Sequence, residues 1–227
     1  YHPYIGEVGN AYGPGDQKSV NSYTNNYMIE GIFGRVQYDY KEKYFVSGFI
    51  LSDASSRFAK GHRWGTFYSF GAAWNLAKES FMEDYKWVDF LKLKASYGEQ
   101  GNDNLSSADY PYFPYADIYD ISYDPDNNAY SKTLVQLGNE ELTWEKNRNF
   151  NVGIDFVLWK GRMSGSLEFF IRSTSDMLYY LNQPASSGYG SLQKPINVGS
   201  VRNLGIDLQL NGNPIKKKNF NWDVNFN

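Results

Sequence analysis

A pair of long segments between Phe150 and Tyr179 alternates apolar and polar residues, and this alternation constrains the fold more than any other feature. The apolar residues of the first segment fall on even positions: Phe150, Val152, Ile154, Phe156 and Leu158. Those of the second segment fall mostly on odd positions: Met163, Gly165, Leu167, Phe169 and Ile171. A period of two with a short Gly-containing turn predicts an antiparallel hairpin. Its second face is polar through the middle of both strands.

The same alternation recurs in eight segments. They are residues 31–40, 44–53, 66–76, 90–98, 150–158, 163–174, 200–212 and 220–227. The segment 44–53 is ambiguous because both of its faces carry apolar residues. The pattern predicts an all-β protein, a transmembrane antiparallel β-barrel with about eight strands in this chain.

The connections between these segments alternate in length. The short ones are residues 41–43, 159–162 and 214–219, and the long ones are residues 53–65, 99–143 and 175–196. An intermediate link, residues 76–90, is expected to hold a helical turn around residues 79–82. Short turns at one end and long loops at the other are typical of outer-membrane barrels.

The composition excludes several other classes. A net charge of −3 gives no basic footprint for a nucleic acid. The chain has no Cys and only His2 and His62, so thiolate metal sites and a Ser-His-Asp triad lack the necessary residues. No apolar run is long enough for a membrane helix, and residues 1–17 do not read as a signal peptide. The mean hydropathy of −0.58 also suits a barrel with a polar lumen.

Aromatic residues gather near the short turns. They are Tyr38, Tyr40, Tyr44, Trp74, Trp159 and Trp222. This is where the aromatic girdle of a membrane barrel would lie. Aromatic residues also favour strands for packing reasons alone, so the girdle supports a barrel only in combination with strands that are polar through the middle of one face.

The two chain ends argue against a self-contained eight-stranded barrel. With the short turns in the periplasm, the first strand would start outside the cell and the last would return there. The last segment would also leave an unpaired edge in lipid. We therefore expect residues 1–227 to form part of one larger barrel domain.

Several stretches resemble the SusC/RagA-like family of TonB-dependent outer-membrane transporters. They are residues 34–44, 52–74, 91–102, 142–156, 162–170, 197–211 and 220–227, in the family's order. The resemblance covers nearly everything from Gly31 onward. Tyr68 stands where members often have Pro, and Leu204 where a basic residue is common.

This resemblance implies a large plugged barrel of the 22-stranded type in the bacterial outer membrane. It implies import of oligosaccharides or peptides, a SusD-like surface lipoprotein as a lid, and energy supplied through TonB. The plug, the TonB-contacting segment and the last strand would lie outside this chain. A dimer of transporter–lipoprotein pairs is left open, and the cargo is not indicated.

Two loops hold candidate contacts for ligand or lid. The loop around residues 53–67 carries Arg57, Arg63 and Trp64. The alternative, favoured here, is a structured hairpin loop in which Arg and Asp pair to order the backbone.

The second loop, residues 108–124, is dense in aromatic and acidic residues. Its candidates are Tyr110, Tyr112, Phe113, Tyr115, Tyr119 and Tyr123. Aromatic side chains bind sugar rings and also dock proteins. A loop packed on its own aromatic cluster is an equal alternative.

The remaining motifs indicate little chemistry. The stretch DPDNN, residues 124–128, lacks the spacing and terminal Glu of an EF-hand loop, so a turn is favoured over a cation site. The basic run at residues 216–218 reads as a solvated turn. No cofactor, metal or catalytic residue is predicted.

Two other function classes are alternatives to transport. A surface adhesin or receptor barrel without transport would share the alternation and differ in lacking a plug. A soluble β-rich enzyme would need clustered carboxylates. The acidic residues here are scattered among loops and polar strand faces, so we expect no enzyme.

Overall fold

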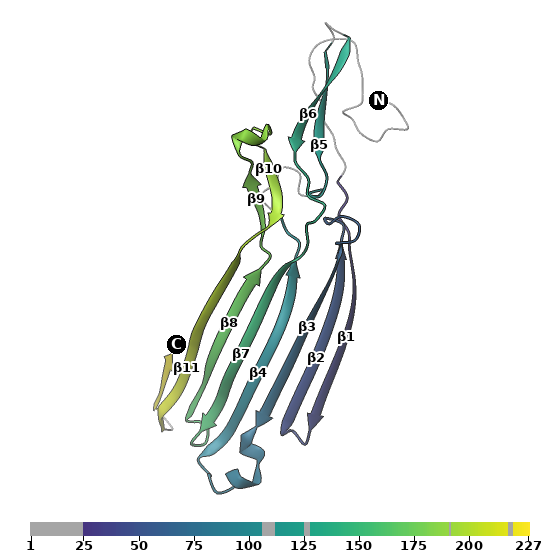
Figure 1. Ribbon diagram of the computed structural model, residues 1–227. Helices are drawn as coiled ribbons and strands as arrows, with labels where there is room; N and C mark the ends of the chain where they lie inside the picture. Colours follow the sequence, from purple (N-terminus) through teal and green to yellow (C-terminus); the bar gives the residue numbers. More distant parts are fainter. Residues whose placement is uncertain (1–24, 106–111, 125–127, 191, 218–219) are drawn as a thin grey trace, which may run out of the picture.

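The computed structural model describes residues 25–105, 112–124, 128–190, 192–217 and 220–227. These residues form one eight-stranded antiparallel sheet and two separate two-stranded hairpins (Figure 1). The large sheet contains β1 (Ile29–Tyr40), β2 (Tyr44–Ser55), β3 (Trp64–Asn75), β4 (Val88–Asn102), β7 (Glu145–Leu158), β8 (Met163–Ser175), β11 (Ser200–Lys217) and β12 (Phe220–Phe226). All eight predicted segments are therefore strands, and the predicted all-β class is confirmed.

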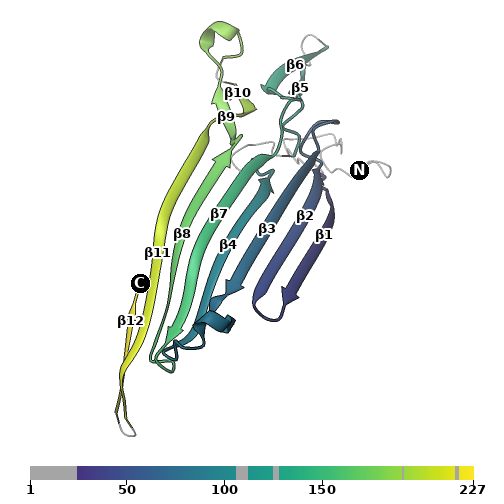
Figure 2. The same ribbon diagram turned by 60° about the horizontal axis from the view of Figure 1, so that its bottom comes forward.

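The strands pair with their neighbours in the order β1-β2-β3-β4-β7-β8-β11-β12. Within the described ranges the sheet stays open, with β1 and β12 at its two edges. Both views show the short connections at one end and the two hairpins at the other (Figures 1 and 2). We call these the turn end and the loop end. None of the helices in this part of the chain is long and apolar enough to cross a membrane.

The long connections contain more structure than the sequence indicated. One holds the hairpin of β5 (Ile118–Asp124) and β6 (Ala129–Gln136), and another holds β9 (Leu178–Asn182), η4 (Ala185–Ser187) and β10 (Gln193–Asn197). These strands pair with each other and not with the large sheet. All four strands are short, and β5, β6 and β9 are mostly exposed, so the alternation pattern over a core face is weak there.

The short connection predicted over residues 214–219 has narrower bounds than expected, and a second predicted turn is confirmed. Residues 214–217 continue β11, although Pro214 and a basic run suggested a turn. A register shift between Gly212 and Ile215 lets β11 pass Pro214, as bulges commonly do for a residue that cannot donate to the ladder. The helical turn predicted around residues 79–82 is confirmed by η2 (Leu76–Lys78) and η3 (Ser80–Met82).

The ladder aligns the alternating residues into two chemically distinct faces. One row across four strands is Ala95, Val152, Phe169 and Ile206. The next row is Lys94, Gly153, Glu168 and Asp207. We call these the apolar face and the polar face. On the polar face the ammonium of Lys94 lies 3.0 Å from Asp155 and 3.2 Å from Glu168, so charges pair within the sheet.

Strand β2 is apolar on both faces for a structural reason. On the polar face, Phe49 contacts Phe33 with ring centroids 6.1 Å apart, and Lys92 lies 4.6 Å over the ring of Phe45. Leu51, farther along, packs against a buried cluster at the loop end. These contacts explain why periodicity alone could not assign the faces of this strand.

Glu79 joins three elements at the turn end. Its carboxylate accepts hydrogen bonds from the Tyr44 hydroxyl at 2.7 Å, the Trp74 indole at 3.0 Å and the Lys43 ammonium at 3.1 Å. These donors favour the ionised form and lower the pKa of Glu79 to about 2. The ionised Glu79 carboxylate therefore holds the link between β3 and β4 against the β1–β2 turn through these hydrogen bonds.

We predict that an arginine on the apolar face is costly and one on the polar face is not. Leu208→Arg would place a charge in lipid and should destabilise the folded barrel by about 2–4 kcal/mol. Gln209→Arg, on the polar face, is the matched control and should cost little. Urea unfolding of the intact protein in lipid vesicles measures both. Equal tolerance of the two substitutions would contradict the assignment of the faces.

We also predict acid sensitivity at the turn end. Because the pKa of Glu79 is lowered on folding, its contribution is present above the ordinary value of 4.5 and is lost as the pH falls toward 2. Glu79→Gln should abolish that share of the pH dependence. Urea midpoints of the intact protein at about pH 6 and about pH 3 would show a smaller difference for the variant. An unchanged difference would mean that Glu79 is not the titrating group.

Candidate functional site

A small buried cluster organises the loop end. It consists of Phe58, Phe67, Leu105, Leu142 and Trp144. The ring of Trp144 lies 5.3 Å from that of Phe58 and 5.6 Å from that of Phe67, and its indole donates to the carbonyl of Arg63 at 2.8 Å. Burial of each aromatic side chain stabilises the folded state by roughly 1.5–3 kcal/mol. The cluster thus fixes the loop of residues 56–63 against β3 and the start of β7.

A partly buried ionic network, centred on the buried Asp103, joins the same loop to the start of β1 and the end of β4. Asp103 accepts hydrogen bonds from the hydroxyls of Tyr27 at 2.9 Å and Ser55 at 2.6 Å. The Arg57 guanidinium lies 3.4 Å from the Asp103 carboxylate and 4.5 Å from the centre of the Tyr27 ring. Burial, together with the bonded carboxylate, raises the pKa of Tyr27 to about 12. Tyr27 therefore stays a neutral donor to Asp103.

The candidates of the first loop have different environments. Arg57 is in the ionic network, paired with Asp103 of another connection. Arg63 donates through Nε to the carbonyl of Phe58 at 3.1 Å, inside its own loop. Trp64, the first residue of β3, leaves 54% of its surface exposed. Of these three side chains, the Trp64 indole is the one most open to an outside partner.

The candidates around residue 114 pack on the base of the β5–β6 hairpin. Phe113 and Tyr115 meet edge to face with ring centroids 6.5 Å apart, and Pro114 between them is buried. Tyr112 is partly buried beside them. Tyr110 lies outside the described residues.

This base depends on the backbone of residues 136–139. The amide of Gln136 donates to the carbonyl of Phe113 at 3.1 Å, and the Gly138 N–H donates to Asp117 at 2.8 Å. A Cβ on Gly138 would lie 2.4 Å from the backbone of Ala116, so only glycine fits. Residues 112–117 therefore support the base of the β5–β6 hairpin.

The β5–β6 hairpin exposes an apolar face beyond the sheet. Tyr119, Ile121 and Tyr130 leave 39%, 67% and 77% of their surfaces exposed. The ammonium of Lys132 lies 3.9 Å over the ring of Tyr119 on that face. Tyr123 pairs with Tyr130 in the ladder, and its side chain lies outside what the structure describes. Exposed aromatic rings with a cation suit a protein partner or a sugar ring.

Side-chain amides join the β9–β10 hairpin to the connection between β4 and β7, which carries the β5–β6 hairpin. Asn197 donates to the carbonyls of Thr143 at 2.8 Å and Asp176 at 2.9 Å, and accepts from the Thr143 N–H at 2.9 Å. Asn139 donates to the carbonyl of Pro195 at 2.9 Å. The two connections therefore form one assembly at the loop end.

The residues that position this assembly are not evident from the sequence. They are Ser55, Asp103, Asn139 and Asn197, and no motif in the sequence singles them out. Their partners lie 46 to 56 positions away for the Arg57–Asp103 and Asn139–Pro195 contacts, so no local spacing could reveal them. In the described ranges no group of three acidic or His side chains could hold a metal ion.

We predict that Asp103 controls the order of the first loop. Asp103→Ala would leave the Arg57 charge and two hydroxyls without their buried acceptor and should cost about 3 kcal/mol of local stability. Hydrogen–deuterium exchange over residues 55–64 of the intact protein should rise strongly. Glu140→Ala, which removes an exposed carboxylate, is the control and should leave the exchange unchanged. Unchanged exchange in Asp103→Ala would contradict the role of the network.

Comparisons with known proteins agree with this architecture. The family model for the TonB dependent receptor-like β-barrel matches residues 1–227. TonB-dependent receptor SusC from Bacteroides thetaiotaomicron is 32% identical over 215 residues, which cover 92% of this chain and 21% of SusC. TonB-dependent receptor P39 from Formosa agariphila is 32% identical over 201 residues, 88% of this chain and 19% of the relative.

Solved structures are similar as well. The RagAB peptide importer in its closed-closed state superimposes with a TM-score of 0.76 and 30% identity over 88% of this chain and 21% of the importer chain. The siderophore receptor PirA from Pseudomonas aeruginosa shares the fold, with a TM-score of 0.55 and 14% identity over 88% of this chain and 33% of that chain.

The chain spans about a fifth of the length of SusC and of P39. Its sheet is consistent with a segment of a larger barrel, as its open edges and the shared fold indicate. The chain belongs to the TonB-dependent receptor β-barrel family, as a SusC/RagA-like protein of the bacterial outer membrane.

Proposed function

We propose that this chain forms part of the barrel wall of an active importer for oligosaccharides or peptides. A SusD-like lipoprotein covers the loop end, and TonB drives transport through parts of the transporter outside these residues. The observation that carries the proposal is the polar face that runs from β4 to β11 behind an apolar face, in a chain similar to SusC and to the RagAB peptide importer.

The polar face suits a water-filled or plugged lumen. Lys94 is paired with Asp155 and Glu168, and the neighbouring rows carry Asn149, Asn151 and Gln209. Such side chains bind water, a plug or a passing solute through hydrogen bonds. A non-transporting adhesin barrel is the alternative, and the exposed hairpin at the loop end would serve it equally well.

The proposed lid or cargo surface lies on Trp64 and the exposed side of the β5–β6 hairpin. Arg57 and Arg63 support it by ordering the loop beneath Trp64, and Tyr112, Phe113 and Tyr115 support it by seating the hairpin. Tyr110 and Tyr123 stay contact candidates by their place in the sequence. We propose no catalytic step, and pairing of two transporter–lipoprotein units is compatible with this arrangement.

Uptake by cells tests the transport class. A strain lacking the gene, complemented with the intact gene, should accumulate fluorescent oligosaccharides or fluorescent short peptides. A protonophore should abolish accumulation, because import through TonB depends on the energised inner membrane. Binding of either probe at the cell surface without accumulation would favour the adhesin. Accumulation that survives the protonophore would contradict TonB-driven import.

We predict that the exposed hairpin face contacts the lid. Tyr119→Ser with Ile121→Ser should weaken recovery of the lipoprotein with the intact transporter by about tenfold, because central aromatic and apolar contacts dominate interfaces. Asp120→Ser with Thr133→Ser, on the opposite hairpin face, should have no effect. Recovery is measured by quantitative mass spectrometry after affinity purification.

The same variants distinguish whether the hairpin face contacts the lid or the cargo. Normal lipoprotein recovery with weaker binding of the fluorescent probe would assign the face to cargo. Normal recovery and normal probe binding together would show that the hairpin face contacts neither.

A further inference from the structure

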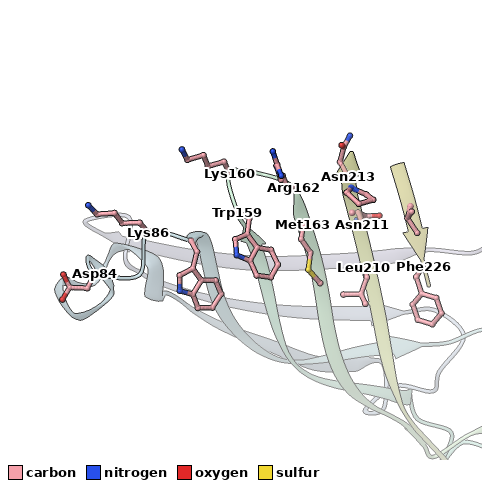
Figure 3. A pocket seen from close by; sticks show the side chains of 14 residues that line it. Asp84, Lys86, Trp159, Lys160, Arg162, Met163, Leu210, Asn211, Asn213 and Phe226 are labelled. Carbon is pink, nitrogen blue, oxygen red and sulfur yellow. The ribbon is translucent and has the colours of Figure 1, made fainter. Parts of the chain in front are cut away.

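A hollow of about 1050 Å³ lies at the turn end, away from the loops (Figure 3). Its floor is apolar and is made by Trp87, Trp159, Met163, Leu210 and Phe226. Lys86, Lys160 and Arg162 stand at its rim and extend to one side in the close-up view. The hollow thus combines an apolar floor with a basic rim.

The floor belongs to the apolar face of the sheet. Met163 pairs with Leu158 and Gly212, and Leu210 pairs with Phe226, in the rows that continue the apolar alternation. In an outer-membrane barrel this face contacts lipid, and the short turns mark its periplasmic rim. The hollow therefore opens to the inner leaflet at the depth of the headgroups.

The apolar floor of the hollow is pre-formed. The Trp87 and Trp159 rings stack with centroids 5.9 Å apart and planes at 27°, while 48% and 49% of their surfaces stay exposed. The Trp159 N–H donates to the Trp87 carbonyl at 2.7 Å, and the Gly161 N–H donates to Asp89 at 3.0 Å.

The turn also takes an unusual backbone conformation. Trp159, Lys160 and Gly161 all have positive φ, between 54° and 75°. The Asn213 N–H donates to the Arg162 carbonyl at 2.7 Å, which joins this turn to the β11–β12 hairpin. Such pre-organisation lowers the cost of binding.

The rim of the hollow carries an excess of positive charge among the residues that line it. Across the described ranges no carboxylate forms an ion pair with Lys86, Lys160 or Arg162. Asp84 is the one acidic side chain that lines the hollow, so the rim is net positive within the described part of the chain. An anionic headgroup complements this charge, and basic residues at a membrane surface attract anionic lipid.

We propose that this hollow binds one anionic phospholipid of the inner leaflet. Its phosphodiester would lie among Lys160, Arg162 and Lys86, and an acyl chain would lie along Trp159, Met163 and Leu210. Tryptophan and basic side chains commonly mark this depth of a membrane. The proposal rests on the position of the sheet in the membrane and not on import.

Lipid titration of the intact protein in detergent micelles tests the proposal. Native mass spectrometry would count bound dioleoyl phosphatidylglycerol against dioleoyl phosphatidylcholine. The wild type should prefer phosphatidylglycerol, and Lys160→Gln with Arg162→Gln should weaken its binding by about tenfold. Lys41→Gln with Lys60→Gln removes the same charge elsewhere and should bind like the wild type.

A second readout locates the lipid. Phosphatidylglycerol with brominated acyl chains should quench tryptophan fluorescence, and Trp87→Phe with Trp159→Phe should remove much of that quenching. A wild type without preference would overturn the proposal, as would a charge variant that keeps it. Equal loss in the Lys41/Lys60 control would also overturn it. The proposal would also be overturned if the wild type bound a protein subunit in place of lipid and the charge variant lost that subunit.

Discussion

The structure depends on backbone pairing in a layer that offers no water. Every peptide group in the hydrocarbon region needs a partner, and a ladder of antiparallel strands supplies it. Once the strands pair, the period of two sends alternate side chains to lipid and to the lumen. The row from Ala95 to Ile206 and the row from Lys94 to Asp207 are the result. Register therefore matters as much as composition, because a slip of one residue would exchange the two faces.

The two ends of the sheet solve different problems. At the turn end, polar groups on short connections hold neighbouring hairpins together, as Glu79 does with Tyr44 and Trp74. The stacked Trp87 and Trp159 give that end its aromatic boundary. At the loop end, long connections must be ordered without a ladder to the sheet. Apolar burial around Trp144 and the network at Asp103 supply that order.

The loop end therefore resembles a small folded domain seated on a barrel wall. Its apolar cluster is buried, its Arg57–Asp103 ion pair is largely shielded from solvent, and its side-chain amides join separate connections. The exposed hairpin face stands on this base, which explains how an apolar surface is presented in a fixed place. A rigid platform loses less entropy when a partner binds.

The sequence by itself determined the eight strands, the two faces of every strand except β2, and the alternation of short and long connections, because all of these follow from residue periodicity. It also indicated the helical turn near Glu79. It could not place Asp103 beside Tyr27 and Arg57, or Asn197 beside Thr143, because those contacts join residues far apart in the chain. Nor could it show that β11 passes Pro214, since the register shift depends on the partner strand. Only the tertiary structure brought Trp87, Trp159 and the β11–β12 hairpin around one hollow, because strand order and curvature decide which distant side chains share a surface.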